Sequence, residues 1–304
     1  MNLLSLKEWN KELIESVIDK AIAIKNHQEE FYHSASYKSL AMLFQKTSTR
    51  TRVSFEVGMT QLGGHSLFID WKNSNFTLSD IRDEIRYLSR NVDIIMARLL
   101  KNEELLIIAE HSQVPVINGC CEKFHPCQIL TDLLTIKEKF GRLDGIKVVY
   151  TGIHNNVCNS WILAASKVGL NLILVTPEVH PPCVDKEVMN IAETSPYITK
   201  GDSLKEAAKE ADVVYTDSWV DMEFFLDPSF EEEKKRRVNL MLPFQINKEN
   251  LDGSNALVMH DMPIHEGYEI TRDVIECEKS IIFDQSENRL HSQKAIILKL
   301  LNHF

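Results

Sequence analysis

The stretch LAMLFQKTSTRTRVSFEV, residues 40–57, decides the fold that we expect for this chain. Leu40–Phe44 is an unbroken apolar run, typical of a strand buried in a parallel sheet. Val53–Val57 can begin a helix. Between them, Lys46–Arg52 alternates hydroxyl and guanidinium side chains at a strand-to-helix junction. Because a helix N-terminus favours anions and arginine binds phosphate through two N–H groups, this junction is a candidate anion site. The alternative is a capped helix with solvated arginines.

Short apolar runs alternate with helical patterns along the rest of the chain. A helical spacing predicts a first helix that contains Trp9, Leu13, Val17, Ala21 and Ile24. The expected strands are Leu40–Phe44, Leu67–Asp70, Val92–Ala97, Val114–Ile117, Lys147–Tyr150, Asn171–Val175, Val213–Thr216, Leu257–Met259 and Ile281–Phe283. The charge run Glu231–Arg237 predicts a solvated helix face, and Ser286–Leu301 predicts a long final helix. The alternation predicts an α/β protein with helices on both faces of parallel sheets.

The composition argues against several classes of function. The chain has 304 residues and a net charge of −10, so we expect about two domains and no binding to nucleic acid. No apolar run approaches the length of a membrane span, and residues 1–8 lack the layout of a secretion signal. The six cysteines form no Cys-x-x-Cys pair, so we expect no metal site, no disulfide framework and a cytoplasmic setting.

Polar side chains follow five of the expected strands. These clusters are Arg98, residues 125–128, Asn155 with Asn156, residues 217–222 and residues 260–263. Ligands of open parallel sheets bind beyond the carboxyl ends of the strands. Five such clusters together therefore predict a ligand site rather than five solvated turns.

Two motifs together resemble the carbamoyl phosphate-binding motifs of the aspartate/ornithine carbamoyltransferase family. They are Ser48-Thr49-Arg50-Thr51-Arg52 and Phe124-His125-Pro126-Cys127-Gln128. Three further segments resemble the ornithine branch, namely Asn155-Asn156 with Asn159-Ser160, Thr216-Asp217-Ser218-Trp219-Val220, and Phe283-Asp284 through Glu287-Asn288-Arg289. Aspartate enzymes carry arginines in the loops that correspond to residues 154–157 and 217–220. Neither loop contains an arginine here, so aspartate is a poor candidate acceptor.

The resemblance covers nearly the whole chain and implies two doubly wound α/β domains with parallel sheets, and a C-terminal helix that returns to the first domain. We place the carbamoyl phosphate-binding domain at residues 1–140 together with helix 286–304, and the acceptor-binding domain at residues 145–285. The family also implies a homotrimer, or a multiple of trimers, with active sites between subunits and no cofactor. A neighbouring loop, Trp71–Asn75, would complete each site, with ordinary packing as the alternative for Trp71.

The implied reaction moves the carbamoyl group of carbamoyl phosphate to an amine and releases phosphate. Positioning and preorganised electrostatics are sufficient for it without a covalent intermediate. By resemblance, the phosphate is held by Ser48, Thr49, Arg50 and Thr51. Arg289 would add positive charge from the far domain, unless it is a surface arginine of the final helix.

The carbamoyl group has its own expected partners. Arg98 would bridge the phosphate and the carbonyl oxygen, and His125 would donate a hydrogen bond to that oxygen. Gln128 would accept a hydrogen bond from the carbamoyl NH2 group, and Met262 would offer its backbone carbonyl. The alternatives are a solvated loop arginine for Arg98 and a helix-capping role for His125.

The acceptor side departs from the family. Ornithine enzymes usually carry Asp-x-x-x-Ser-Met-Gly and His-Cys-Leu-Pro, where this chain has residues 217–223 and His260-Asp261-Met262-Pro263. Asp261 could raise the pKa of the amine, act as a general base, or bind a second cationic group together with Asp221. We expect an altered pocket for ornithine or a related diamino acid, lined by Asn155, Asn156, Asp217, Asp221, Met222 and Asp261. These carboxylates could also point away from the site.

Three other interpretations stay open at the level of the sequence. The chain could have ordinary ornithine specificity, or it could be a carbamoyl phosphate-binding paralogue without catalysis. Retention of His125, Gln128 and the arginines argues against the second of these. A dinucleotide-binding protein is a weak alternative, because the turn after Lys147–Tyr150 lacks Gly-x-Gly-x-x-Gly.

Overall fold

The computed structural model of the chain describes residues 1–220 and 224–303, and these residues form two compact units. The first unit comprises Met1–Gly141 and Glu287–Phe304, and the second comprises Arg142–Ser286. Each unit contains one parallel sheet, with strand order β2-β1-β3-β4 in the first and β7-β6-β5-β8-β9 in the second. The prediction of two parallel-sheet α/β units, with the C-terminal helix packed on the first, is confirmed.

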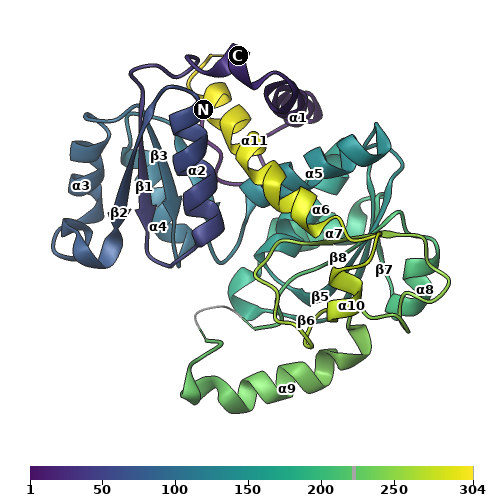
Figure 1. The fold of residues 1–304 in the computed structure, drawn as a ribbon. Coiled ribbons are helices and arrows are strands. Elements are labelled where there is room, and N and C mark those ends of the chain that lie inside the picture. Colours follow the sequence, from purple (N-terminus) through teal and green to yellow (C-terminus); the bar gives the residue numbers. More distant parts are fainter. Residues whose placement is uncertain (221–223, 304) are drawn as a thin grey trace. The chain divides into compact units, whose positions relative to one another are not determined.

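The first unit has helices on both faces of its four-stranded sheet (Figure 1). Its strands are β1 Ser39–Phe44, β2 His65–Asp70, β3 Ile94–Arg98 and β4 Val116–Cys120. Its α-helices are α1 Lys11–Asn26, α2 Thr49–Gln61, α3 Ile81–Leu88, α4 Asn102–His111, α5 Pro126–Phe140 and most of α11 Ile282–Leu300. Short 3-10 helices lie at Gln28–Phe31 (η1), Trp71–Asn73 (η2) and Asn75–Thr77 (η3).

Helices α3 and α4 bury apolar side chains against one face of this sheet. Ile85 of α3 and Leu105 of α4 pack in one cluster with the strand residues Leu43 and Ile95, and all four are fully buried. Trp71 belongs to the same cluster, and its ring centroid lies 4.6 Å from that of Phe76. The alternation of side chains along each strand leaves the opposite face for α2 and α5.

Strands β1 and β3 run parallel, with Phe44 opposite Arg98, and α2 begins shortly after β1 ends. The carboxyl ends of both strands therefore lie near the start of α2.

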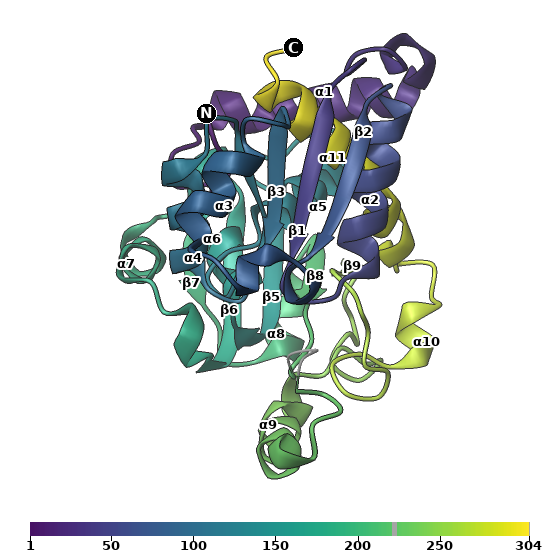
Figure 2. The same ribbon diagram turned by 90° about the vertical axis from the view of Figure 1, so that its left-hand side faces the viewer.

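The second unit is built around a five-stranded sheet, whose strands are labelled in Figure 2. The strands are β5 Lys147–His154, β6 Asn171–Val179, β7 Ile198–Lys200, β8 Val213–Thr216 and β9 Leu257–His260. The α-helices are α6 Asn156–Val168, α7 Lys186–Thr194, α8 Leu204–Lys209, α9 Glu231–Met241 and α10 Arg272–Ile275. The 3-10 helices are η4 Pro181–Cys183, η5 Pro228–Phe230 and η6 Leu242–Phe244.

Alternate residues of the second sheet face two different cores. Val149, Val214 and Val258 pack with α8 and α10 on one face. On the other face, the ring of Tyr215 lies 5.8 Å from that of Tyr150 and 5.3 Å from that of Trp161 in α6. Because all strands of this sheet run parallel, their carboxyl ends, and with them the polar clusters, lie at one edge of the sheet.

Three expectations about elements were wrong. Ile281–Phe283 is not a strand, because the chain makes only an isolated bridge between Ser280 and Val258 and then enters α11 at Ile282. The three-residue strand β7 was missed, since only Ile198 in it is buried. The charge run on α9 is not wholly solvated, because Arg237 is buried and its Nε donates to Glu233 at 2.9 Å.

Candidate active site

The N-terminus of α2 stands where the sequence predicts an anion site. Ser48 is the N-cap residue, and its Oγ accepts a hydrogen bond from the Thr51 N–H at 3.3 Å. The same Oγ donates to Thr51 Oγ1 at 3.0 Å. Thr51 is fully buried, Arg50 is half-buried and Thr49 is exposed. The hydroxyl groups thus order the first turn of a helix whose dipole favours an anion.

Arg289 connects three helices of the first unit. Its Nη1 donates to Gln128 Oε1 of α5 at 2.7 Å, and its Nη2 donates to Thr51 Oγ1 of α2 at 3.0 Å. Arg289 is 3% exposed and belongs to the first unit, so the expectation that it acts from the far domain is wrong. The structure therefore brings Arg289 together with Thr51 and Gln128.

Gln128 has a fixed orientation. Its Nε2 donates to Asp132 Oδ1 at 2.9 Å, which identifies its other amide atom as the acceptor from Arg289. A carbonyl oxygen has two lone pairs, so Oε1 retains the capacity to accept a second hydrogen bond. This orientation is compatible with the expected hydrogen bond from a carbamoyl NH2 group.

His125 lies at the N-terminus of α5, directly before Pro126, and is 4% exposed. Its pKa is held well below the ordinary histidine value, first by burial and then by four cations, which are Arg289, Arg98, Lys46 and Arg50. The imidazole is therefore neutral at physiological pH, and a neutral imidazole still carries one N–H donor. These four cations come from three separate segments, namely the junction before and at the start of α2, the end of β3, and α11.

Arg98 is the last residue of β3 and is 8% exposed. Within the described residues, its buried Nε has no hydrogen-bond partner, and no carboxylate lies within ion-pair distance of its guanidinium. Arg237, which is equally buried, contrasts with it because Arg237 pairs with Glu233. A buried cation without a counter-ion costs folding free energy. Arg98 is therefore a candidate to bind an anion from outside the chain.

Lys46 is a residue whose role the sequence did not identify. It lowers the pKa of His125, and it lines a cavity of 330 Å³ in the first unit with Thr47, Ser48 and Thr49. Lys72 lines the same cavity. The sequence feature that could have identified Lys46 is its position after a strand, at the start of the hydroxyl-guanidinium motif Lys46–Arg52.

The residues expected to bind the acceptor lie in the second unit. Asn155 caps α6, since its Oδ1 accepts from the N–H groups of Val157 and Cys158 at 3.0 and 3.1 Å. Its Nδ2 donates to Asp217 Oδ2 at 2.6 Å. The side chain of Asn155 therefore connects the loops that follow β5 and β8. The Oδ1 atom of Asn156 accepts a hydrogen bond from the Val157 N–H. Asp221 and Met222 lie outside the described residues.

The loop after β9 is organised by a buried hydrogen-bond chain. The Met262 N–H donates to His260 Nδ1 at 2.8 Å, so Nε2 is the protonated nitrogen and donates to Glu269 Oε1 at 3.0 Å. Both side chains of this histidine–glutamate pair are fully buried. Met262 has a φ of 60°, a left-handed conformation that this hydrogen bond helps to hold.

Asp261 lies beside this hydrogen-bond chain. Its Oδ1 is 3.6 Å from His260 Nδ1, and its side chain is 10% exposed. Burial, and then the charges of Asp217, Cys158 and Asp261, raise the pKa of Tyr150 well above its ordinary value. Ser218 Oγ donates to the Pro263 carbonyl at 3.0 Å, which connects the loops after β8 and β9. These loops thus form a second polar site.

Within the described residues, no cluster of three or more His, Cys, Asp or Glu side chains has the arrangement of a metal site. No helix of this part of the chain is both long enough and apolar enough to span a membrane.

Comparison with known proteins identifies the family. The model of the aspartate/ornithine carbamoyltransferase carbamoyl-P binding domain matches residues 1–138, and that of the Asp/Orn binding domain matches residues 144–300. Ornithine carbamoyltransferase of Pyrococcus horikoshii is 41% identical, over 99% of this chain and 95% of the relative. That of Haloquadratum walsbyi is 39% identical, over 99% of this chain and 98% of the relative.

Solved structures agree with this result. Ornithine carbamoyltransferase from Pyrococcus furiosus has a TM-score of 0.90 and 38% identity, covering 99% of this chain and 97% of that chain. The enzyme from Thermus thermophilus has a TM-score of 0.86 and 34% identity, with coverage of 99% and 98%. The chain thus belongs to the aspartate/ornithine carbamoyltransferase family and is a carbamoyltransferase.

Proposed function

We propose that this enzyme transfers the carbamoyl group of carbamoyl phosphate to the side-chain amine of ornithine and releases phosphate. The observation that carries the proposal is Arg98, a buried guanidinium that has no counter-ion among the described residues and acts electrostatically on His125 together with Lys46 and Arg50. A doubly charged phosphate supplies the missing negative charge. The names of the relatives support ornithine as the acceptor.

The cationic site performs the electrostatic part of the reaction. The neutral amine forms a C–N bond to the carbonyl carbon, the C–O bond to phosphate breaks with its electron pair going to the phosphate, and the departing phosphate accepts the proton that the amine loses. Negative charge builds on the carbonyl oxygen in the tetrahedral state, where neutral His125 donates a hydrogen bond and Arg98 adds its charge. Ser48, Thr49, Arg50 and Thr51 hold the departing phosphate. Gln128 orients the carbamoyl NH2 group.

Asp261 favours a second candidate acceptor. Its carboxylate stands where ornithine enzymes usually carry cysteine, and both it and Asp217 act electrostatically on Tyr150. Two carboxylates can bind an acceptor that carries a second or a more extended cationic group. The retained catalytic side chains and the relatives give no support to the paralogue without catalysis.

We also propose that the working form is a homotrimer, or a multiple of trimers, with a neighbouring copy completing each site. Trp71 is 8% exposed and packed in its own core, which is the ordinary packing that the sequence left open. Exposed Lys72 is therefore the side chain of this loop best suited to act across a subunit contact.

The test is acceptor-dependent phosphate release from carbamoyl phosphate. The acceptors are ornithine, lysine, 2,4-diaminobutyrate, putrescine, N-acetylornithine and aspartate. Ornithine should be the best acceptor, with one citrulline formed per phosphate released. A better rate with another diamino acid would replace ornithine by the second candidate. In that case Asp261→Cys should shift the preference toward ornithine.

A further inference from the structure

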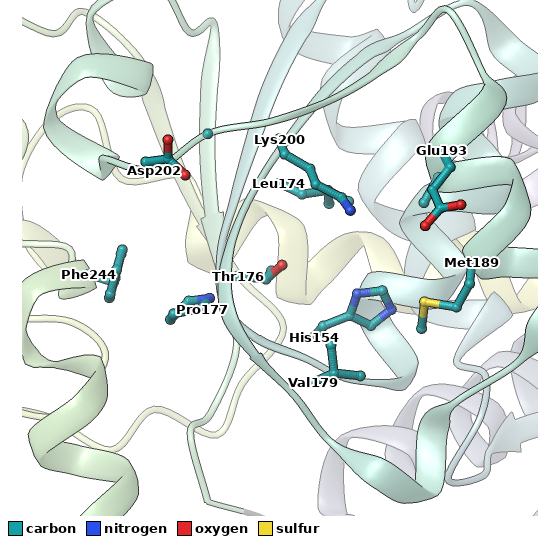
Figure 3. A pocket seen from close by; sticks show the side chains of 12 residues that line it. His154, Leu174, Thr176, Pro177, Val179, Met189, Glu193, Lys200, Asp202 and Phe244 are labelled. Carbon is teal, nitrogen blue, oxygen red and sulfur yellow. The ribbon is translucent and has the colours of Figure 1, made fainter.

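A cavity of 290 Å³ in the second unit lies apart from the residues assigned above (Figure 3). It opens at the carboxyl ends of β5, β6 and β7, whereas the acceptor residues follow β5, β8 and β9. This edge of an open parallel sheet is where such folds bind ligands. The volume is at the lower end of the range for ligand pockets, so it fits a molecule of amino-acid size.

His154 is a buried polar side chain on the wall of this cavity. It is 4% exposed, and its Nε2 lies 2.7 Å from Asn159 Oδ1. Asn159 Nδ2 donates to the Cys183 carbonyl at 2.7 Å, so Oδ1 is the acceptor and His154 Nε2 carries the proton. Burial lowers the pKa of His154, as does Lys200. The imidazole is then neutral, and its Nδ1 is a hydrogen-bond acceptor with no partner in the described residues.

Three charged side chains line the same cavity. They are Lys200 at the end of β7, Asp202 after it, and Glu193 on α7. None of them makes an ion pair with another described residue. Figure 3 shows Lys200, Glu193 and Met189 on the same side of Thr176 as His154, and Asp202 on the other side of Thr176. The cavity thus offers one cation and two anions at separate positions along a partly apolar wall.

We propose that this cavity binds a dibasic α-amino acid. Its carboxylate pairs with Lys200, and its two cationic groups pair with Glu193 and Asp202. The Nδ1 atom of His154 accepts a hydrogen bond from one of these cationic groups, and the aliphatic chain packs on Leu174 and Met189. The fixed charges lining the cavity sum to −1, which complements a ligand with a net charge of +1.

Occupancy of this cavity affects the acceptor loops, a consequence that rests on the proposed function. His154 directly precedes Asn155, which caps α6 and donates to Asp217. A ligand held by His154 shifts the end of β5 and with it this amide. The ligand therefore changes the KM for the acceptor more than the KM for carbamoyl phosphate.

The test is calorimetric titration of the intact enzyme with L-arginine in the absence of both substrates. Saturable binding is expected, with affinity lowered at least about tenfold by Lys200→Met and by Glu193→Gln. Lys209→Met is the matched control, because Lys209 pairs with Glu206 outside the cavity. Binding that is absent, or that responds to Asp261→Asn and not to Lys200→Met, overturns the proposal. Since this test needs no turnover, it is independent of the proposed reaction.

Two analogues test the charge pattern. L-Norleucine lacks the second cation, and agmatine lacks the carboxylate. Both should bind at least about tenfold more weakly than L-arginine to the same enzyme. Equal affinity for L-norleucine would contradict the role of the two carboxylates, and equal affinity for agmatine would contradict that of Lys200.

Discussion

Two buried arginines of the first unit differ in how they are partnered. Arg289 is tied to Thr51 and Gln128, whereas Arg98 is buried without a counter-ion among the described residues. A side chain that stabilised the fold would have its partner within the chain. The proposed function therefore implies that Arg98 binds the phosphate at a cost in stability.

Arg98→Met tests this distinction. The substitution should lower kcat/KM for carbamoyl phosphate by about 10²–10³-fold, which is typical when a donor to a developing oxyanion is removed. It should leave the free energy of unfolding unchanged or raised, because it removes an uncompensated buried charge. Arg90→Met, at an exposed arginine of the same unit, is the control for both measurements. A destabilised Arg98→Met variant with normal kinetics would assign Arg98 a structural role.

The charge state of His125 can be measured directly. Since burial and four cations hold its pKa well below the ordinary value of about 6.5, its protonated form appears only at lower pH. An NMR titration of the histidine ring signals, with His125→Gln for assignment, should show a neutral imidazole through the ordinary histidine range. A midpoint near 6.5 would mean that the cations do not surround His125 as described.

At the scale of elements, α11 illustrates what the sequence could predict and what it could not. Its apolar periodicity predicted a long helix, but its start was placed at Ser286 instead of Ile282. The run Ile281-Ile282-Phe283 reads equally well as a strand, because three apolar residues carry no period. The tertiary contact of Gln285 Oε1 with the His260 N–H, at 2.8 Å, lies outside any local pattern.

Lys294 on α11 is a buried cation whose removal should stabilise the enzyme. It is 2% exposed, and burial lowers its pKa. A lysine with a lowered folded pKa destabilises the fold at every pH below its unfolded pKa of about 10.4. Lys294→Met should therefore raise the free energy of unfolding at neutral pH by about 1–2 kcal/mol. Urea unfolding measures this, and exposed Lys139→Met should have little effect.

His291 on the same helix should make stability depend on pH. Burial, and then Lys294 and Lys25, lower its pKa to about 4. The pKa of a histidine in the unfolded chain is about 6.5, so on acidification the unfolded chain binds the proton before the folded enzyme does. The free energy of unfolding therefore falls as the pH drops from about 6.5 to about 4. The loss approaches about 3 kcal/mol.

The comparison for His291 uses urea unfolding at several pH values. His291→Gln should flatten the acid side of the profile, whereas His65→Gln, at an exposed histidine, should leave it as in the parent enzyme. An unchanged profile in His291→Gln would show that other groups account for the acid sensitivity.

For the whole molecule, the sequence predicted the two-sheet plan and most strands, because long buried strands and helix periods are local signals. The assignment of the carbamoyl phosphate residues through their motifs stays a prediction. Local patterns could not predict the direct hydrogen bond from Arg289 to Thr51, since that contact spans 238 residues of chain. The hydrogen-bond chain from Met262 through His260 to Glu269 was likewise missed, because its residue types are common in loops.

Subunit hybrids test whether a neighbouring copy completes the site. Arg98→Met and Lys72→Ala should each be inactive alone if Lys72 acts across a subunit contact. Mixed and reassembled in equal amounts, they should recover about a quarter of parental activity, because one ordered pair of neighbours in four carries both intact residues. No recovery, with hybrids verified by native mass spectrometry, would place Lys72 outside the neighbour's site.

The most direct test of the central claim is ornithine-dependent phosphate release from carbamoyl phosphate, with citrulline measured in the same reaction. The account predicts equal amounts of citrulline and phosphate with ornithine, and loss of both in Arg98→Met but not in Arg90→Met. Phosphate release that does not depend on ornithine, or a preference for aspartate, would contradict it.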